Sequence, residues 1–444
     1  MMRFLPSLIL TKLDGRENRK KILSNIGWLF ADRVLRMGVG LVLGVWVARY
    51  LGPEQFGVYN YAIAFVTLFS VFGTLGLDSI VVRDLVNDPA NRDETLGTAF
   101  VLKLLGSIVG LFLAVGSISL LRPTDSLIFW LVAIAATGIT FQSFDTIDFW
   151  FQSRVQSKYT VYSKNLAFAL MAIIKIILIK IEAPLITFAW AGLAEIILGF
   201  IGLIFVYQTC GNSLIKWRVS IFRAKILLTH STPLILSSIA IIIYMKIDQI
   251  MLGEMVGNKA VGLYSAVTRI SEVWYFIPTV ISSSVFPAIL EAKKKDKELY
   301  YQHLTKLFKL MSLVSYAVAI PTTFLSSWFM NLLYGSNYRE AGIILAVHIW
   351  AGLFVCLGVV RSLWMNTENL MVFSFFTTAI GAICNILINL YMIPKFQGLG
   401  AAIATVIAYA IAAVFSCFFY DKTRRIGLII LNSMLLKNYQ YEEK

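Results

Sequence analysis

Residues 51–59, LGPEQFGVY, and residues 256–264, VGNKAVGLY, are two versions of one pattern. At one constant offset they match at three positions, Gly52 with Gly257, Gly57 with Gly262 and Tyr59 with Tyr264. Each version follows the first long apolar run of its half of the chain. Three matches alone are a weak signal, but their identical placement in each half predicts an internal repeat.

The apolar runs give the fold class. A helix needs about 20 apolar residues to cross the hydrocarbon core of a bilayer. We find about twelve such runs, near residues 24–48, 58–82, 97–121, 127–151, 160–180, 185–208, 226–252, 261–289, 305–330, 341–363, 370–393 and 398–420. The predicted fold is an all-α integral membrane protein with two six-helix lobes. Because six is even, the repeat is parallel, with its pseudo-two-fold axis along the membrane normal.

The composition agrees with a membrane protein. Hydrophobic residues make up 58% of the chain and charged residues 14%, whereas soluble domains are about half apolar and a quarter charged. The net charge of +14 would suggest a nucleic-acid partner in a soluble protein. Here the basic residues lie between apolar runs, so we expect anionic membrane lipids as their partners and no nucleic acid.

The basic residues also predict the topology. If the N-terminus is cytoplasmic, the outer loops carry only single basic residues: Arg49, Arg122, Lys180, Lys259, Arg339 and Lys395. The inner segments carry the remaining clusters, so both termini are predicted to be cytoplasmic. The predicted domains are a first lobe at 1–208, a basic cytoplasmic linker at 209–225, a second lobe at 226–420 and a cytoplasmic tail at 421–444. An apolar stretch at 426–436 is too short to span, and predicts an interfacial or docked helix.

Three charged residues lie in the middle of the first span. An ionisable group at bilayer depth costs several kcal/mol or more, so it needs a reason to be there. Asp32 and Arg36 are one turn apart and are expected to pair, which leaves Arg33 less compensated. Guanidinium groups bind phosphate oxygens bidentately, so Arg33 and Arg36 are candidate ligands of an anionic cargo. The alternative is a structural clamp between helices.

Other mid-depth charges are candidates for the same cavity. Arg269 and Glu272 are three residues apart and either bridge each other or line the cavity with Arg269 as a further anion contact. Glu195 either carries a coupling proton or bonds to a neighbouring helix. Asp248 is a candidate for coupling or charge balance, as are Asp32 and Glu272. Three more charges are expected nearer the interfaces, with Asp145 and Asp148 solvated and Lys175 extending outward.

Two segments resemble a known family. Residues 48–62, ARYLGPEQFGVYNYA, resemble the first-loop signature of the Wzx-type polysaccharide flippases of the multidrug/oligosaccharidyl-lipid/polysaccharide superfamily. Residues 394–405, PKFQGLGAAIAT, resemble the start of their last helix, and the segments around Asp248 and Tyr264 look like the start of their second lobe. The resemblance implies two lobes around a cationic cavity, alternating access, and an undecaprenyl-diphosphate-linked oligosaccharide as cargo. It also implies a proton or sodium gradient as the drive.

The expected function is therefore a flippase for O-antigen, capsule or another surface polymer in a bacterial plasma membrane, with polysaccharide polymerase machinery as an expected partner. A multidrug exporter of the same superfamily is the main alternative, although its cargo is commonly cationic, which the two arginines of the first span disfavour. An enzyme is not expected, since the sequence has no catalytic motif and its outer loops are short. A non-transporting scaffold would have little use for mid-depth charges. No cofactor or metal is expected apart from the coupling ion.

Overall fold

The computed structural model describes residues 16–437, and this part of the chain is helical, without strands. Residues 1–15 and 438–444, which hold parts of the two predicted tails, lie outside the described residues. Ten helical segments of the described part are long and apolar enough to cross a membrane. Two of them, Asp32–Asn87 and Met371–Phe418, each contain a non-helical residue that divides them into two helices. The described part therefore has the twelve predicted spans.

The long helices form two compact units that meet in the sequence between Lys246 and Ile247. The first unit contains α2 (Arg16–Thr74), α3 (Asp78–Asn87), α4 (Arg92–Leu121), α5 (Ser126–Phe141), α6 (Asp145–Ser153), α7 (Lys158–Lys180) and α8 (Leu185–Thr209). The connecting helix is α9 (Ile221–Met255). The second unit continues with α10 (Asn258–Glu272), α11 (Phe276–Lys295), α12 (Lys297–Tyr334), α13 (Ala341–His348), α14 (Ala351–Thr367), α15 (Met371–Ala413) and α16 (Asp421–Met434).

The repeated sequence pattern produces the same backbone break in both units. Gly52 interrupts α2 with φ 69° and ψ 171°, and Gly257 precedes α10 with φ 120° and ψ 175°. Residues with a Cβ rarely adopt positive φ, because the Cβ approaches the backbone oxygen. Glycine at these two positions therefore lets one transmembrane helix end and the next begin. The predicted repeat is confirmed at the level of backbone conformation.

A third break lies within α15, at Gln397, where φ is 50° and ψ is −129°. It separates the last two spans, in the segment 394–405 that the sequence assigns to the start of the last helix. A glutamine in this conformation is strained, since its side chain crowds the backbone.

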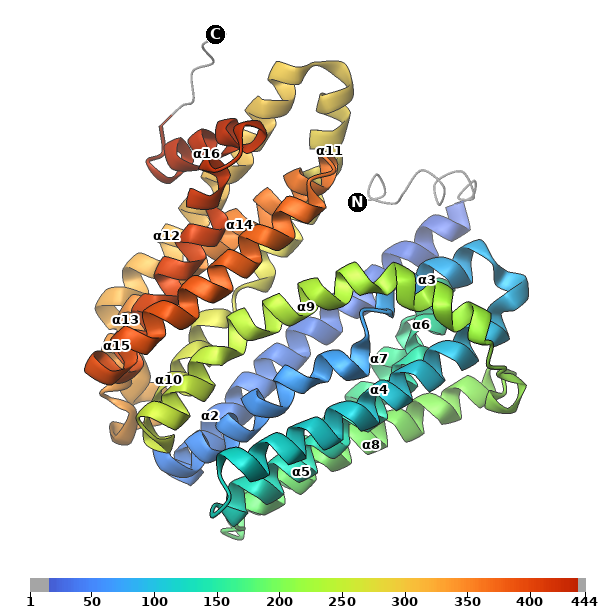
Figure 1. The fold of residues 1–444 in the computed structure, drawn as a ribbon, viewed down its shortest axis with the longest axis horizontal. Coiled ribbons are helices and arrows are strands. Elements are labelled where there is room, and N and C mark those ends of the chain that lie inside the picture. Colours follow the sequence, from blue (N-terminus) through green and yellow to red (C-terminus); the bar gives the residue numbers. More distant parts are fainter. Residues whose placement is uncertain (1–15, 438–444) are drawn as a thin grey trace. The chain divides into compact units, whose positions relative to one another are not determined.

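Within the first unit, α7 packs against both α8 and α2, and α5 packs against α4 and α8. These helices run as long rods beside one another (Figure 1). A short 3-10 turn, Gln142–Phe144, joins α5 to α6, so that one span consists of two helical pieces. This packing brings α2, α6, α7 and α8 together, and these four helices carry the charged side chains of the first unit.

The start of α9 is attached to the first unit. The guanidinium of Arg223 donates to the hydroxyl of Thr95 at 2.8 and 3.1 Å. It also lies 3.9 Å from Asp84 and 3.8 Å from Asp88. From Ile247 onward, α9 belongs to the second unit. One continuous helix is thus shared between the two units.

The tail helix α16 is docked, as predicted. Ile426, Ile429 and Ile430 are fully buried in a cluster with α12 and α14 side chains. The hydroxyl of Tyr316 in α12 donates to the carbonyl of Met434 at 2.7 Å. The helix is too short to span a bilayer, and its apolar face is instead covered by protein (Figure 1).

Candidate functional site

The charged residues of the first span adopt the predicted pairing. Arg36 Nε donates to Asp32 Oδ1 at 2.8 Å, one turn apart on α2. The Arg36 guanidinium also lies over the ring of Phe168 in α7, 5.2 Å from its centroid. Arg33 is exposed, and it forms no ion pair among the side chains that the structure describes. As expected, Arg33 is the less compensated charge, while its role in binding stays a prediction.

The guanidinium of Arg36 is incompletely satisfied. Its Nη2 atom is buried and has no hydrogen-bond partner within the described part of the chain. A buried donor without an acceptor costs free energy, and more so when the donor is charged. An incoming anion would supply the missing acceptor, which is the chemistry expected of a phosphate-binding arginine.

A second charged cluster lies on α6 and α7. Lys164 Nζ is 3.0 Å from Asp145 Oδ1 and 3.7 Å from Asp148 Oδ2. Asp148 also accepts from the hydroxyl of Thr160 at 2.7 Å and from the Gln152 amide at 3.2 Å. The two aspartates are thus partly buried and paired, which corrects the expectation that they are solvated. Lys164 was missed by sequence reasoning, although a lysine within a span opposite two carboxylates was a usable signal.

A third ion pair joins α7 to α8. Lys175 Nζ lies 2.9 Å from Glu195 Oε2. Lys175 therefore does not simply extend to the outer interface as expected. For Glu195, the structure fits the alternative of a bond to a neighbouring helix, and its part in coupling stays a prediction.

The second unit contains a buried carboxylate, Asp248, which is only 3% exposed. Its Oδ2 accepts from Tyr264 at 2.8 Å and from Thr405 at 2.6 Å, and its Oδ1 accepts from Asn389 at 2.6 Å. Asn389 also donates to Asn385 Oδ1 at 3.0 Å. No lysine, arginine or histidine forms an ion pair with Asp248 in the part of the chain that the structure describes.

The elements of the second unit position this cluster. Asp248 comes from α9, Tyr264 from α10, Asn385 and Asn389 from α15 before its break, and Thr405 from α15 after it. Sequence reasoning selected Asp248 and the repeat tyrosine, but missed the two asparagines and the threonine. Polar residues with period near four inside an apolar run were the available signal, since they share one helix face. The cluster offers several oxygen atoms around one carboxylate, which suits a proton or a hard monovalent cation.

Arg269 and Glu272 lie at the end of α10 and are partly buried. The Arg269 charge lies close to Tyr338, which follows α12. Burial raises the pKa of Tyr338, so its hydroxyl stays neutral beside this charge. Mutual neutralisation of Arg269 and Glu272, and their place in a cavity, stay predictions.

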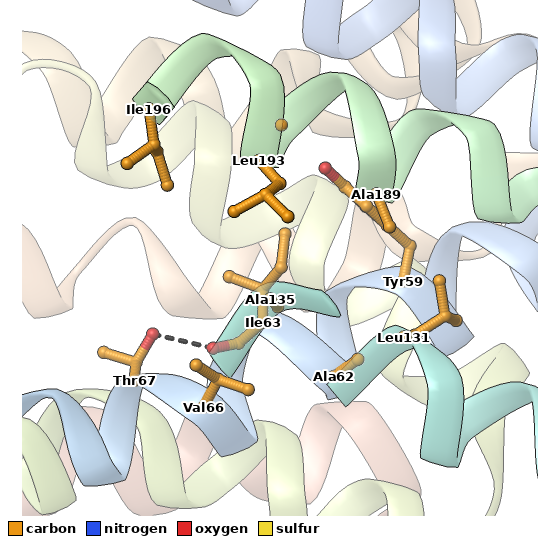
Figure 2. Close-up of a pocket in the computed structure, with 11 residues that line it drawn as sticks. Tyr59, Ala62, Ile63, Val66, Thr67, Leu131, Ala135, Ala189, Leu193 and Ile196 are labelled. Carbon is orange, nitrogen blue, oxygen red and sulfur yellow. Dashed lines mark hydrogen bonds between the residues drawn. The ribbon is translucent and has the colours of Figure 1, made fainter. Parts of the chain in front are cut away.

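An apolar cavity of about 210 Å³ lies within the first unit, between the second part of α2, α5 and α8 (Figure 2). Its lining residues are mostly aliphatic: Tyr59, Ala62, Ile63, Val66, Thr67, Leu131, Ala135, Ala189, Gly192, Leu193 and Ile196. The Thr67 hydroxyl is already bonded to the Ile63 carbonyl at 2.7 Å. No charged side chain lines the cavity, so it suits hydrocarbon and not a sugar or phosphate.

The two units are alike in one further respect. Tyr59 Oη lies beside Gly192 of α8, 3.7 Å from where a Cβ on that glycine would be, while Tyr264 Oη lies 3.0 Å from Thr405 Oγ1 of α15. Each repeat tyrosine thus reaches the last spanning helix of its own unit. The side chains that it meets differ, so the same scaffold carries different chemistry in each half.

The fold and the charged clusters define a multi-pass membrane protein built from two six-helix halves. The family model described as "Polysaccharide biosynthesis protein" matches residues 22–293, more than half of the chain. A second model, MatE, matches residues 233–392. The chain belongs to the polysaccharide biosynthesis protein family, within the multidrug/oligosaccharidyl-lipid/polysaccharide superfamily.

Relatives and solved structures agree with this assignment. The chain is 21% identical to the capsular polysaccharide biosynthesis protein CapF of Staphylococcus aureus, over 90% of this chain and 100% of that protein. It is 25% identical to a putative O-antigen transporter of Shigella flexneri, over 66% of this chain and 72% of that protein. Among solved structures, the inward closed conformation of the lipid II flippase MurJ has a TM-score of 0.67 at 19% identity, covering 93% of this chain and 91% of that one. An inward-facing multidrug resistance MATE transporter has a TM-score of 0.72 at 13% identity, covering 88% and 95%.

Proposed function

We propose that this protein moves an undecaprenyl-diphosphate-linked oligosaccharide from the cytoplasmic to the outer face of a bacterial plasma membrane. The observation that carries the proposal is the pair of arginines in the first span, one exposed and one with an unpartnered buried donor. The family assignment and the relatives named for capsule and O-antigen support the same cargo class. The flipped repeat units would then be available to polysaccharide polymerase machinery on the outer face.

The diphosphate is the part of the cargo that Arg33 and Arg36 would recognise. Each guanidinium presents two parallel N–H donors to phosphate oxygens, which gives both affinity and orientation. Arg269 of the second unit would be a further contact as the two units alternate in exposing the site. Most of the binding free energy would thus come from the lipid-linked head, with the sugar left free to vary.

The energy for transport would come from a proton or sodium ion bound at Asp248. A proton would neutralise the carboxylate, and a sodium ion would be held by Asp248 together with the Thr405 hydroxyl and the asparagine amide oxygens. Asn389 Oδ1 is buried and has no hydrogen-bond partner among the described residues, so it has a lone pair to offer a cation. Anionic cargo and cationic driver would therefore use separate units of one chain.

The first experiment locates the lipid-linked intermediate in cells that lack the protein. Polyprenyl-diphosphate oligosaccharide is extracted, and its sidedness is probed in intact and in opened cells. We expect it to accumulate on the cytoplasmic face, and to be cleared by the wild type but not by Arg33→Ala/Arg36→Ala. As a matched control, Lys158→Met removes an exposed basic residue of the first unit and should clear it normally.

The multidrug exporter is the second candidate, favoured by the MatE match and by the fold of the MATE structure. It predicts drug sensitivity in the deletion strain, with surface polysaccharide unchanged. Normal polysaccharide with no trapped intermediate would exclude the flippase proposal and leave the exporter in its place.

A further inference from the structure

Two cations of the first unit lie next to each other on neighbouring helices. Arg36 of α2 rests over Phe168, which is one turn beyond Lys164 on α7. The charges of Arg36 and Lys164 are close enough to interact. Two like charges on neighbouring spans are unfavourable unless each is compensated. Asp32 compensates Arg36, and Asp145 compensates Lys164.

Both cations nevertheless keep N–H donors that these carboxylates do not use. Arg36 uses Nε for Asp32 and leaves Nη2 buried without a partner among the described residues. Lys164 has one close carboxylate contact at 3.0 Å and one long contact at 3.7 Å, and a third of its side chain is exposed. A lysine ammonium has three donors on a flexible stem, so it can turn to a new acceptor without a change in the backbone.

The two aspartates depend on Lys164 to different degrees. Asp148 Oδ1 accepts from Thr160 and its Oδ2 from Gln152, so it keeps hydrogen bonds if Lys164 moves away. Asp145 has only Lys164 as a recorded side-chain partner within residues 16–437. Moving Lys164 therefore costs the Asp145 ion pair and the longer contact with Asp148, whose other hydrogen bonds remain.

We propose that Lys164 is a third cationic contact for the diphosphate, and that arriving cargo takes Lys164 from Asp145. The inference rests on the proposed function and deepens it. A diphosphate carries enough charge and oxygen atoms to occupy Arg36 Nη2 and Lys164 Nζ together. A monophosphate competes less well with the carboxylates for Lys164. The Asp145 ion pair thus makes the site selective for polyprenyl diphosphates over polyprenyl monophosphates.

The test measures binding of two probes, undecaprenyl diphosphate and undecaprenyl monophosphate, to the purified full-length protein in nanodiscs. Lys164→Met should weaken diphosphate binding about tenfold, the value of one charge-assisted hydrogen bond. Monophosphate binding should change much less, so the ratio of the two affinities falls. Lys164→Arg should restore most of the diphosphate affinity, because the positive charge is kept.

For a second variant, Asp145→Asn, we expect the affinity to change in the opposite direction. Asp145→Asn removes the competitor for Lys164, so both probes should bind several-fold more tightly, with less discrimination between them. A purely structural ion pair would instead make both Lys164→Met and Asp145→Asn weaken binding together with thermal stability. Lys158→Met, in the first turn of α7, is the matched control and should bind both probes like the wild type.

The outcomes separate the two proposals. If the wild type binds neither probe, the proposed function fails. If Arg33→Ala/Arg36→Ala loses diphosphate binding while Lys164→Met keeps both the wild-type affinity and its discrimination, only the role of Lys164 is overturned. Tighter diphosphate binding by Asp145→Asn, together with weaker binding by Lys164→Met, supports the proposal that the diphosphate takes Lys164 from Asp145.

Discussion

At the scale of single residues, the two units hold charge in different ways. In the first unit every carboxylate discussed above has a lysine or arginine beside it. In the second unit Asp248 is surrounded by neutral donors, the Tyr264 and Thr405 hydroxyls and the Asn389 amide. Burying a lone carboxylate is costly, because desolvation is only partly offset by hydrogen bonds. A group kept at that cost is a strong candidate for a functional role.

The Asp248→Asn variant tests that role directly. The asparagine amide has the same shape as the carboxylate. It does not accept a proton at physiological pH, and it binds a cation less tightly. We expect transport of the lipid-linked intermediate to fall to the level of the deletion strain, while thermal stability is unchanged or raised because the buried charge is gone. Full clearance of the intermediate by Asp248→Asn would contradict a coupling role. If Asp248→Asn abolishes transport, assays of the wild type in sodium-free buffer, with and without a proton gradient, distinguish a proton from a sodium ion as the driving ion.

The site residues show what sequence could and could not predict. Asp32, Arg36 and Arg33 were found because a charge inside an apolar run stands out. Lys164 was missed because it lies nearer the start of its run, where a lysine is usually solvated. Asn385 and Thr405 were missed because uncharged polar residues are common in spanning helices, and only their meeting around Asp248 marks them.

At the scale of elements, the spans were predictable because each must carry about 20 apolar residues across the bilayer. Helix ends beyond the apolar core were less predictable, since α12 begins at Lys297 and not near residue 305. The breaks were less predictable. Gly52 and Gly257 could be found because the repeat marks them and glycine explains the positive φ. Gln397 could not, because nothing in a glutamine indicates a left-handed backbone, and its neighbours Gly398 and Gly400 are equally plausible positions for the break.

Substitutions at these breaks should have opposite effects on stability. Gly52→Ala and Gly257→Ala place a Cβ at positive φ and should each destabilise by about 1–2 kcal/mol. Gln397→Gly relieves the strain already present and should stabilise by about 1 kcal/mol. Melting temperatures in detergent give the comparison. Gly116→Ala is the control, since this glycine of α4 has open space around it and alanine is the better helix former. A lower melting temperature for Gln397→Gly would show that its conformation is not strained.

The start of α12 should make stability depend on pH. Asp296 accepts from the backbone N–H groups of Leu299 and Glu298, and these bonds lower the pKa of its carboxyl group. The ionised Asp296 cap therefore stabilises the folded protein fully above the ordinary carboxyl pKa of about 3.9. This stabilisation is lost as the pH falls through the lowered pKa of Asp296. Asp296→Ala should melt at a lower temperature than the wild type at pH 7, and this difference should shrink on acidification. A difference that stays constant with pH would exclude the ionised cap.

At the scale of the whole molecule, the orientation in the membrane is the next quantity to measure. The asymmetry of basic residues predicts that both termini are cytoplasmic. A green fluorescent protein fused after the last residue should fluoresce, and alkaline phosphatase at the same position should be inactive. Alkaline phosphatase inserted between Arg122 and Asp125, in the α4–α5 connection, should be active. The reverse pattern would invert the predicted direction of transport.

The paired breaks at Gly52 and Gly257 also bear on the origin of the protein. Two halves that place glycine at the same point of the same helical pattern are the expected result of duplication of a shorter gene for six helices. After duplication, the glycine at each helix break would be retained, because a residue with a Cβ is strained at positive φ. The polar side chains of the two halves were free to diverge. The carboxylates paired with lysine or arginine in the spans of one half, and Asp248 held by neutral donors in the other, show how far this divergence went. Under the proposed function, one ancestral scaffold would have come to provide two specialised halves, one for the anion and one for the driving cation.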